Sequence, residues 1–84
     1  MEEEKKSLVD RDILYSLLTE TPESISSIAK IYAEHVLQVD VSRMLHNDWV
    51  TLYNSIKHHL LQLVKYKGVK EEKVGRMRCF YVEK

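Results

Sequence analysis

The chain has 84 residues, of which 44% are hydrophobic and 31% charged, and 13 Lys and Arg residues balance 13 Asp and Glu residues. This length and composition favour one ordinary globular domain, residues 1–84, with a modest core. No run approaches the ~18 apolar residues of a membrane span, and the charged N-terminus lacks a secretory pattern. The single cysteine, Cys79, cannot form an internal disulfide, so we expect a cytoplasmic protein.

The N-terminal segment predicts a solvated lead-in followed by a helix. Residues 1–6 are the lead-in, and residues 7–19 are the expected helix, with Ser7 as its N-cap. The apolar face of this helix comprises Val9, Ile13, Leu14, Leu17 and Leu18. Pro22 follows, and it cannot continue a helix because it lacks a backbone N–H.

A second helix is expected over residues 26–37, with Ser26 as its N-cap and a very short strand at Ile25 before it. Its inward positions are Ile28, Ala29, Tyr32 and Val36. The apolar pattern then breaks, and Asp40 is placed to cap one short turn over residues 42–46.

The longest helix is expected over residues 48–67, with Asn47 or Asp48 as its cap and Gly68 just past its end. Its inward stripe comprises Trp49, Leu52, Tyr53, Ile56, Leu60, Leu63 and Val64. Its opposite face comprises Thr51, Asn54, Ser55, His58, Gln62 and Lys65. This face is rich in hydrogen-bonding groups and poor in Glu–Lys pairs, so it offers donors and acceptors of the kind that read base edges.

The C-terminal segment predicts a β-hairpin over residues 69–82, because strand-forming residues flank a turn around Gly75. This end is also basic. Residues 65–84 contain seven Lys or Arg and three Glu, which gives +4, whereas residues 1–24 contain three against seven, which gives −4. Such a dipolar chain could present its basic end to an anionic partner, or its two ends could attract each other in the fold.

Several residues of types that often bind metals or catalyse reactions are expected to have a structural role here. His58 and His59 are adjacent on a helix and point about 100° apart, so they cannot chelate one metal ion together. No paired-cysteine or i, i+4 histidine spacing exists, and no nucleophile–base constellation is visible. Cys79 is expected to be a small buried hydrophobe, and Trp49 and Tyr53 are expected in the core. We therefore expect no metal, no cofactor and no enzymatic activity.

The order of elements resembles a winged helix-turn-helix DNA-binding domain. The segments that carry the likeness are Ser26-Ser27-Ile28-Ala29-Lys30, Leu60-Leu61-Gln62-Leu63-Val64, Lys67-Gly68-Val69, Gly75-Arg76 and Tyr81. The implied fold is mainly α with a small β-hairpin (α+β), a three-helix winged helix. Proteins of this layout occur among bacterial and archaeal transcription regulators and in archaeal viruses and plasmids. Residues 38–47 depart from the family, whose second and third helices are joined by a tight turn.

The resemblance implies a sequence-specific double-stranded DNA-binding protein, a transcription regulator. The helix over 48–67 would lie in the major groove, where the Asn54 amide could pair with adenine. The hairpin would contact the backbone or the adjacent minor groove, and Ser26 and Ser27 would offer backbone N–H groups to a phosphate. The implied DNA-binding residues are Thr51, Asn54, Ser55, Lys57, His58, Lys73, Arg76 and Arg78, with His59 near a phosphate.

The expected partners are double-stranded DNA and a second copy of the chain, with no membrane and no small-molecule ligand. Proteins of this layout commonly dimerise through terminal helices, and here only helix 7–19 is available, with Val9 expected to be partly exposed. Val50, Leu61 and Tyr66 lie at the margins of helix 48–67 and extend this surface, or Val50 and Leu61 pack on helix 7–19 within the monomer. If the protein is viral, its compartment would be the host-cell cytoplasm. The alternative function is a winged-helix protein–protein interaction module in a larger assembly, which the zero net charge suits.

Overall fold

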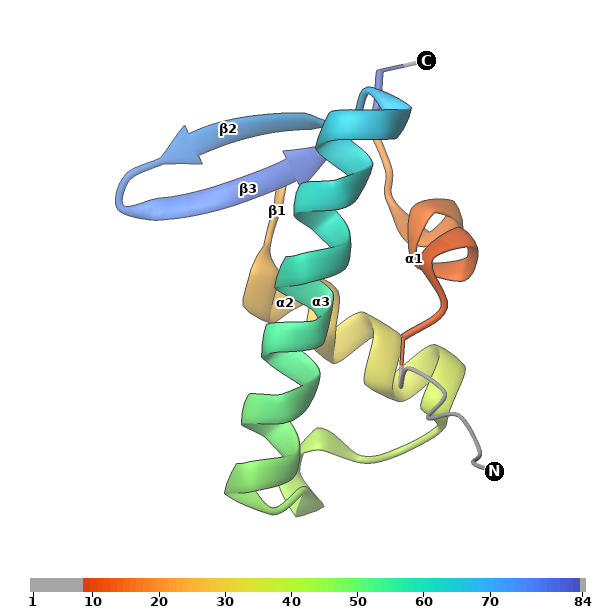
Figure 1. Cartoon of the computed structure of the whole chain (residues 1–84). Helices are drawn as coiled ribbons and strands as arrows, with labels where there is room; N and C mark the ends of the chain where they lie inside the picture. The colour runs from red at the N-terminus through yellow and green to blue at the C-terminus, as the bar shows by residue number, and fades with distance from the viewer. Residues whose placement is uncertain (1–8, 84) are drawn as a thin grey trace.

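The computed structural model describes residues 9–83, which form three α-helices and a small antiparallel sheet (Figure 1). The elements are α1 (Arg11–Leu17), β1 (Glu23–Ser24), α2 (Ile25–Tyr32), η1 (Ala33–Leu37), η2 (Val41–Arg43), α3 (His46–Lys67), β2 (Lys70–Val74) and β3 (Met77–Tyr81). This confirms the expected class, mainly α with a small β component. Within residues 9–83, no helix combines the length and the apolar character needed to cross a membrane.

Helix α1 is shorter than the sequence predicts. The Asp10 carboxylate accepts hydrogen bonds from two backbone N–H groups of the first turn, at 2.9 and 3.1 Å, so Asp10 is the N-cap and Arg11 begins the helix. The predicted helix is therefore present, but its predicted bounds of 7–19 are wrong, since α1 is shorter at both ends. The predicted cap Ser7 and the predicted lead-in over residues 1–6 lie outside the described residues.

The N-cap of helix α2 lies two residues earlier than predicted. The Ser24 hydroxyl accepts a hydrogen bond from the Ser27 N–H at 3.2 Å, so Ser24 is the N-cap in place of Ser26. Ile25 is the first helical residue and its side chain is buried, whereas the predicted short strand lies just before it, as β1. The pairing of β1 with β3 keeps Ser24 extended, as a helix cap must be.

Local hydrogen bonds order the connection between α2 and α3. The turn of π-helix, η1, is capped by Gln38, which has a left-handed φ of 58°. The Asp40 carboxylate then accepts hydrogen bonds from the Ser42 N–H (3.0 Å) and the Ser42 hydroxyl (2.7 Å), which lower the pKa of Asp40. Asp40 thus caps the short turn as predicted, although that turn, η2, begins one residue before the predicted range of 42–46.

Helix α3 begins two residues before the predicted start. Leu45 is the N-cap and makes no side-chain capping hydrogen bond, so the prediction of Asn47 or Asp48 as the cap is wrong. The C-terminal end is as predicted, because Gly68 adopts a φ of 72° and donates its N–H to the Leu63 carbonyl.

The sheet has three antiparallel strands in the order β1–β3–β2. Strands β2 and β3 form the predicted hairpin, in which Val74 pairs with Met77 across a two-residue turn. Gly75 in that turn has a φ of 63°, a conformation that glycine adopts without strain. Because β1 pairs with β3, with Ser24 opposite Cys79, the start of α2 lies beside the hairpin.

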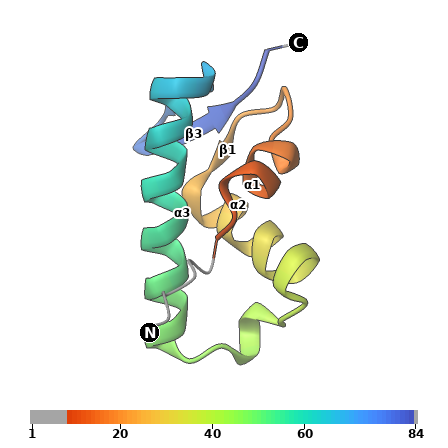
Figure 2. The same cartoon turned by 45° about the vertical axis from the view of Figure 1, so that its right-hand side comes forward.

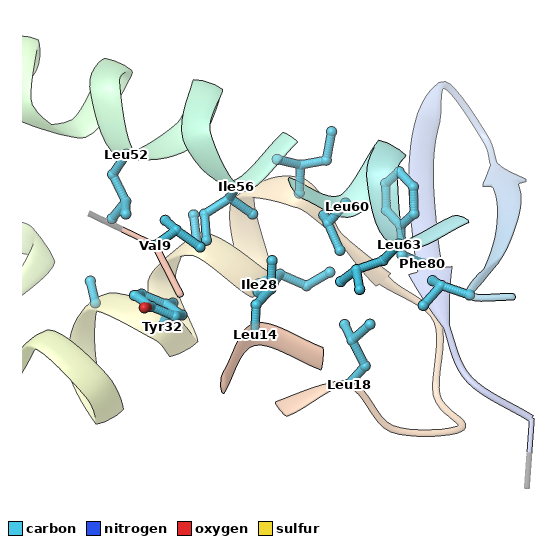
Figure 3. Close-up of a cluster of buried hydrophobic side chains, with 14 of the residues drawn as sticks. Val9, Leu14, Leu18, Ile28, Tyr32, Leu52, Ile56, Leu60, Leu63 and Phe80 are labelled. Atoms are coloured by element: carbon cyan, nitrogen blue, oxygen red, sulfur yellow. The ribbon is translucent and has the colours of Figure 1, made fainter. Parts of the chain in front are cut away.

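The core lies along the inward stripe of α3, where Leu52, Ile56, Leu60 and Leu63 are all at most 1% exposed (Figure 3). The other elements contribute Val9, Leu14, Leu18, Ile28, Tyr32 and Phe80 (Figure 3). Trp49, Tyr53 and Val64 are half-buried and pack against this core. Cys79 is buried, as predicted, whereas Ile13, predicted to point inward, is 41% exposed.

The helices and the hairpin leave one side of α3 uncovered. Helices α1 and α2 lie together on one side of α3 (Figure 2). The hairpin of β2 and β3 projects away from the helices, near the C-terminal end of α3 (Figure 1). Phe80 anchors the inner end of this hairpin in the core, because it is fully buried.

A buried hydroxyl connects α1 to α2. Tyr32, only 1% exposed, accepts a hydrogen bond from the Asp10 N–H at 2.8 Å through its hydroxyl. We expect Tyr32→Phe to lower the free energy of unfolding by about 1 kcal/mol, because Asp10 loses its partner in a partly buried place. Urea denaturation measures this loss. Tyr66→Phe is the control, since Tyr66 is 66% exposed. Equal urea midpoints for Tyr32→Phe and the unsubstituted protein would contradict the account.

Candidate nucleic-acid interface

The polar face of α3 points away from the core, as predicted. Thr51, Asn54 and His58 are exposed on it, and Ser55 is half-buried. The Thr51 hydroxyl donates to the Asn47 carbonyl at 2.9 Å, so its proton is already used, while its oxygen can still accept. Among the described residues, none holds the Asn54 amide in a hydrogen bond. Both the donor and the acceptor of Asn54 are therefore available to a partner.

Three elements enclose a shallow pocket beside this face. Its volume is about 240 Å³, and we name it the interface pocket. It is lined by Ser24, Ile25, Ser26, Tyr53, Lys57, Arg76, Met77 and Arg78. Three of these residues are cations, and none is a carboxylate. The pocket lies between α3, the start of α2 and the hairpin, so it brings cations from distant parts of the sequence together.

The cations of the interface pocket differ in how they are held. Lys57 is exposed on α3, and Arg76 is exposed in the turn of the hairpin. Arg78 forms an ion pair with Glu71 across the hairpin, and this contact raises the pKa of Arg78. Lys73, opposite Arg78 in the strand register, is exposed but does not line the pocket. Among the residues described, Lys57 and Arg76 thus form no ion pair, whereas Arg78 is paired with the Glu71 carboxylate.

The start of α2 offers fewer free backbone N–H groups to a phosphate than predicted. The Ser27 N–H is bonded to the Ser24 hydroxyl, so the prediction that it is offered to a phosphate is wrong. Ser26 is exposed and lines the interface pocket. A phosphate in the pocket would therefore meet the side chain of Ser26 and the first turn of α2.

His59, predicted near a phosphate, lies against α1 instead. Its Nδ1 accepts a hydrogen bond from the Arg11 Nε at 3.0 Å, and its side chain is half-buried. Burial, the Arg11 cation and His58 together lower the pKa of His59 below its ordinary range, against a smaller opposing effect of Asp10. His59 thus joins α1 to α3. His58, whose ring lies 5.6 Å from that of His59, is the histidine on the exposed face.

Four residues of the pocket were not assigned to a site from the sequence, namely Ser24, Ile25, Tyr53 and Met77. Tyr53, expected in the core, packs against the core and also lines the interface pocket. Ser24 lines the pocket because β1 pairs with β3. The sequence does signal Ser24 as a possible cap, since a capping serine bonds to an N–H two or three residues later. It does not signal the pairing of β1 with the hairpin.

The described residues offer this interface rather than a metal centre. Over residues 9–83, no group of three or more His, Cys, Asp or Glu side chains is placed to hold a metal ion. Comparison of the chain with models of protein families, with curated proteins and with solved structures finds no match. The case for a function therefore rests on the interface pocket and on the polar face of α3.

Proposed function

We propose that this protein is a winged-helix transcription regulator that binds double-stranded DNA sequence-specifically. The interface pocket is the observation that carries this proposal. Lys57, Arg76 and Arg78 converge there without a lining carboxylate, next to the exposed polar face of α3. A cluster of cations attracts the phosphate backbone, and a polar helix face can read bases. The zero net charge is no obstacle, because attraction depends on the local distribution of charge.

In this proposal, one set of contacts reads bases and another set binds the phosphate backbone. Helix α3 lies in the major groove, which is wide enough to admit an α-helix, and Asn54 pairs with a base edge. Lys57, Arg76 and Arg78 hold a phosphate at the interface pocket and so fix the register of α3 along the groove. Thr51, Ser55 and His58 lie beside Asn54 on the same face, and Lys73 extends the cationic surface along the hairpin.

A second candidate function is a protein-interaction module, and one observation favours it. An apolar groove of about 450 Å³ lies where α3 begins. It is lined by Leu37, Val39, Arg43, Met44, Leu45, Asp48, Thr51 and Leu52. Leu45 is 71% exposed there, so a partner could bury it. This candidate predicts no preference for duplex DNA, which separates it from the first.

The homodimer stays a prediction, with one correction to its surface. Val9, expected to be partly exposed, is only 2% exposed and belongs to the core. Val50 is 39% exposed and Leu61 is half-buried, so these two residues remain available at the margins of α3.

We expect Arg76→Ala to weaken binding to all duplex sequences, because Arg76 contacts a phosphate. The slope of log K against log salt concentration should fall by about 0.9 in magnitude for one lost phosphate contact. A fluorescence anisotropy titration at several salt concentrations measures both quantities. Lys30→Ala is the matched control, since Lys30 is exposed near the far end of α2 from the interface pocket. An unchanged affinity and salt slope for Arg76→Ala would count against the phosphate contact.

We expect Asn54→Ala to relax the preference at one base pair of the bound sequence. A lost bidentate contact is worth about 1–3 kcal/mol of discrimination. Selection of bound sequences from a random duplex pool, for the natural protein and for Asn54→Ala, measures this change. Gln62→Ala is the control, because it removes another amide from α3 at a half-buried position two turns away. A pool in which the natural protein enriches no sequence would contradict the proposed function.

A further inference from the structure

Two apolar side chains stand at the tip of the hairpin. Val74 is 45% exposed and Met77 is 55% exposed. They are directly opposite each other in the strand register, so both point to the same face of the hairpin. About half of each side-chain surface faces solvent. The tip thus carries a compact apolar pair.

The turn holds this pair at the outermost point of the hairpin. Gly75 has a positive φ and Arg76 does not, which is the φ pattern of a type II′ turn. Nothing lies within 4 Å of the position that a Cβ atom on Gly75 would occupy, so the turn is open on that side. The hairpin extends well beyond the helices (Figure 1). Met77 also lines the interface pocket, so a duplex bound at that pocket would lie next to this apolar pair.

The charges around the apolar pair indicate what kind of partner would fit it. Residues 73–78 carry three cations, Lys73, Arg76 and Arg78, and no carboxylate. Glu72 shares the face of Val74 one step further along the strand, and Glu71 is engaged by Arg78. A partner that fits has an anionic rim and an apolar interior. Duplex DNA has this character at its minor groove, where phosphates flank stacked bases.

We propose that Val74 and Met77 form an apolar wedge that enters the minor groove and partly unstacks a base step, while Arg76 contacts the groove edge or a phosphate. This inference rests on the proposed function and deepens it. Apolar wedges bend the duplex by at least about 20° in proteins that use them. Met77 suits the task because its unbranched thioether adapts its shape to an irregular surface.

The test compares a double substitution, Val74→Thr with Met77→Gln, with the natural protein on a duplex selected by that protein. Both substitutions nearly preserve side-chain size, and Thr keeps the strand preference of Val. We expect affinity to fall about tenfold, since two half-exposed apolar side chains no longer become buried. Energy transfer between dyes at the two duplex ends should also report a smaller bend. Met77→Leu should retain both the affinity and the bend.

Val39→Thr is the matched control, because Val39 is 38% exposed in the connection between α2 and α3, away from the hairpin (Figure 1). It should leave both the affinity and the bend unchanged. If the doubly substituted protein binds and bends the selected duplex as the natural protein does, the wedge is wrong while the proposed function stands. If the natural protein binds no duplex but binds another protein or anionic vesicles through this tip, both the wedge and the proposed function are wrong.

Discussion

The burial of one stripe of α3 is the interaction on which the rest of the structure depends. Leu52, Ile56, Leu60 and Leu63 are almost completely removed from solvent. Each such side chain contributes about 1.5–3 kcal/mol on burial, whereas an exposed ion pair contributes at most about 1 kcal/mol. The rotation of α3 about its axis is therefore set by the core. With that stripe turned inward, the opposite face with Asn54 and His58 must meet solvent.

The hairpin depends on the same core for its position. Phe80 is fully buried, so the inner end of β3 is fixed, and the alternation of side chains along the strand then fixes its outer residues. Pairing of β1 with β3 brings the start of α2 to the same place. These constraints together create the interface pocket. They also explain why Lys57 and Arg76, which are 19 residues apart in the sequence, line the same pocket.

Helical spacing predicted the inward stripe of α3, because that stripe depends on local periodicity. The Gly68 end and the hairpin were predicted from glycine at two turns and from strand-forming residues around Gly75, which are also local signals. The start of α2 was missed because serine occurs at positions 24, 26 and 27, and only pairing with β3 selects among them. His59 was misplaced because its partner, Arg11, lies 48 residues away. The Arg78–Glu71 pair depends on strand register, which sequence alone did not give.

The central claim is that the outward face of α3 and the hairpin together bind duplex DNA. Backbone amide chemical shifts, followed by NMR while a duplex is added at low salt, test it most directly. The account predicts that the shifts change at Asn54, Lys57 and Arg76, and that Ile13 on α1 is unaffected. Changes confined to α1 or to the apolar groove around Leu45, or no change at any residue, would contradict the account.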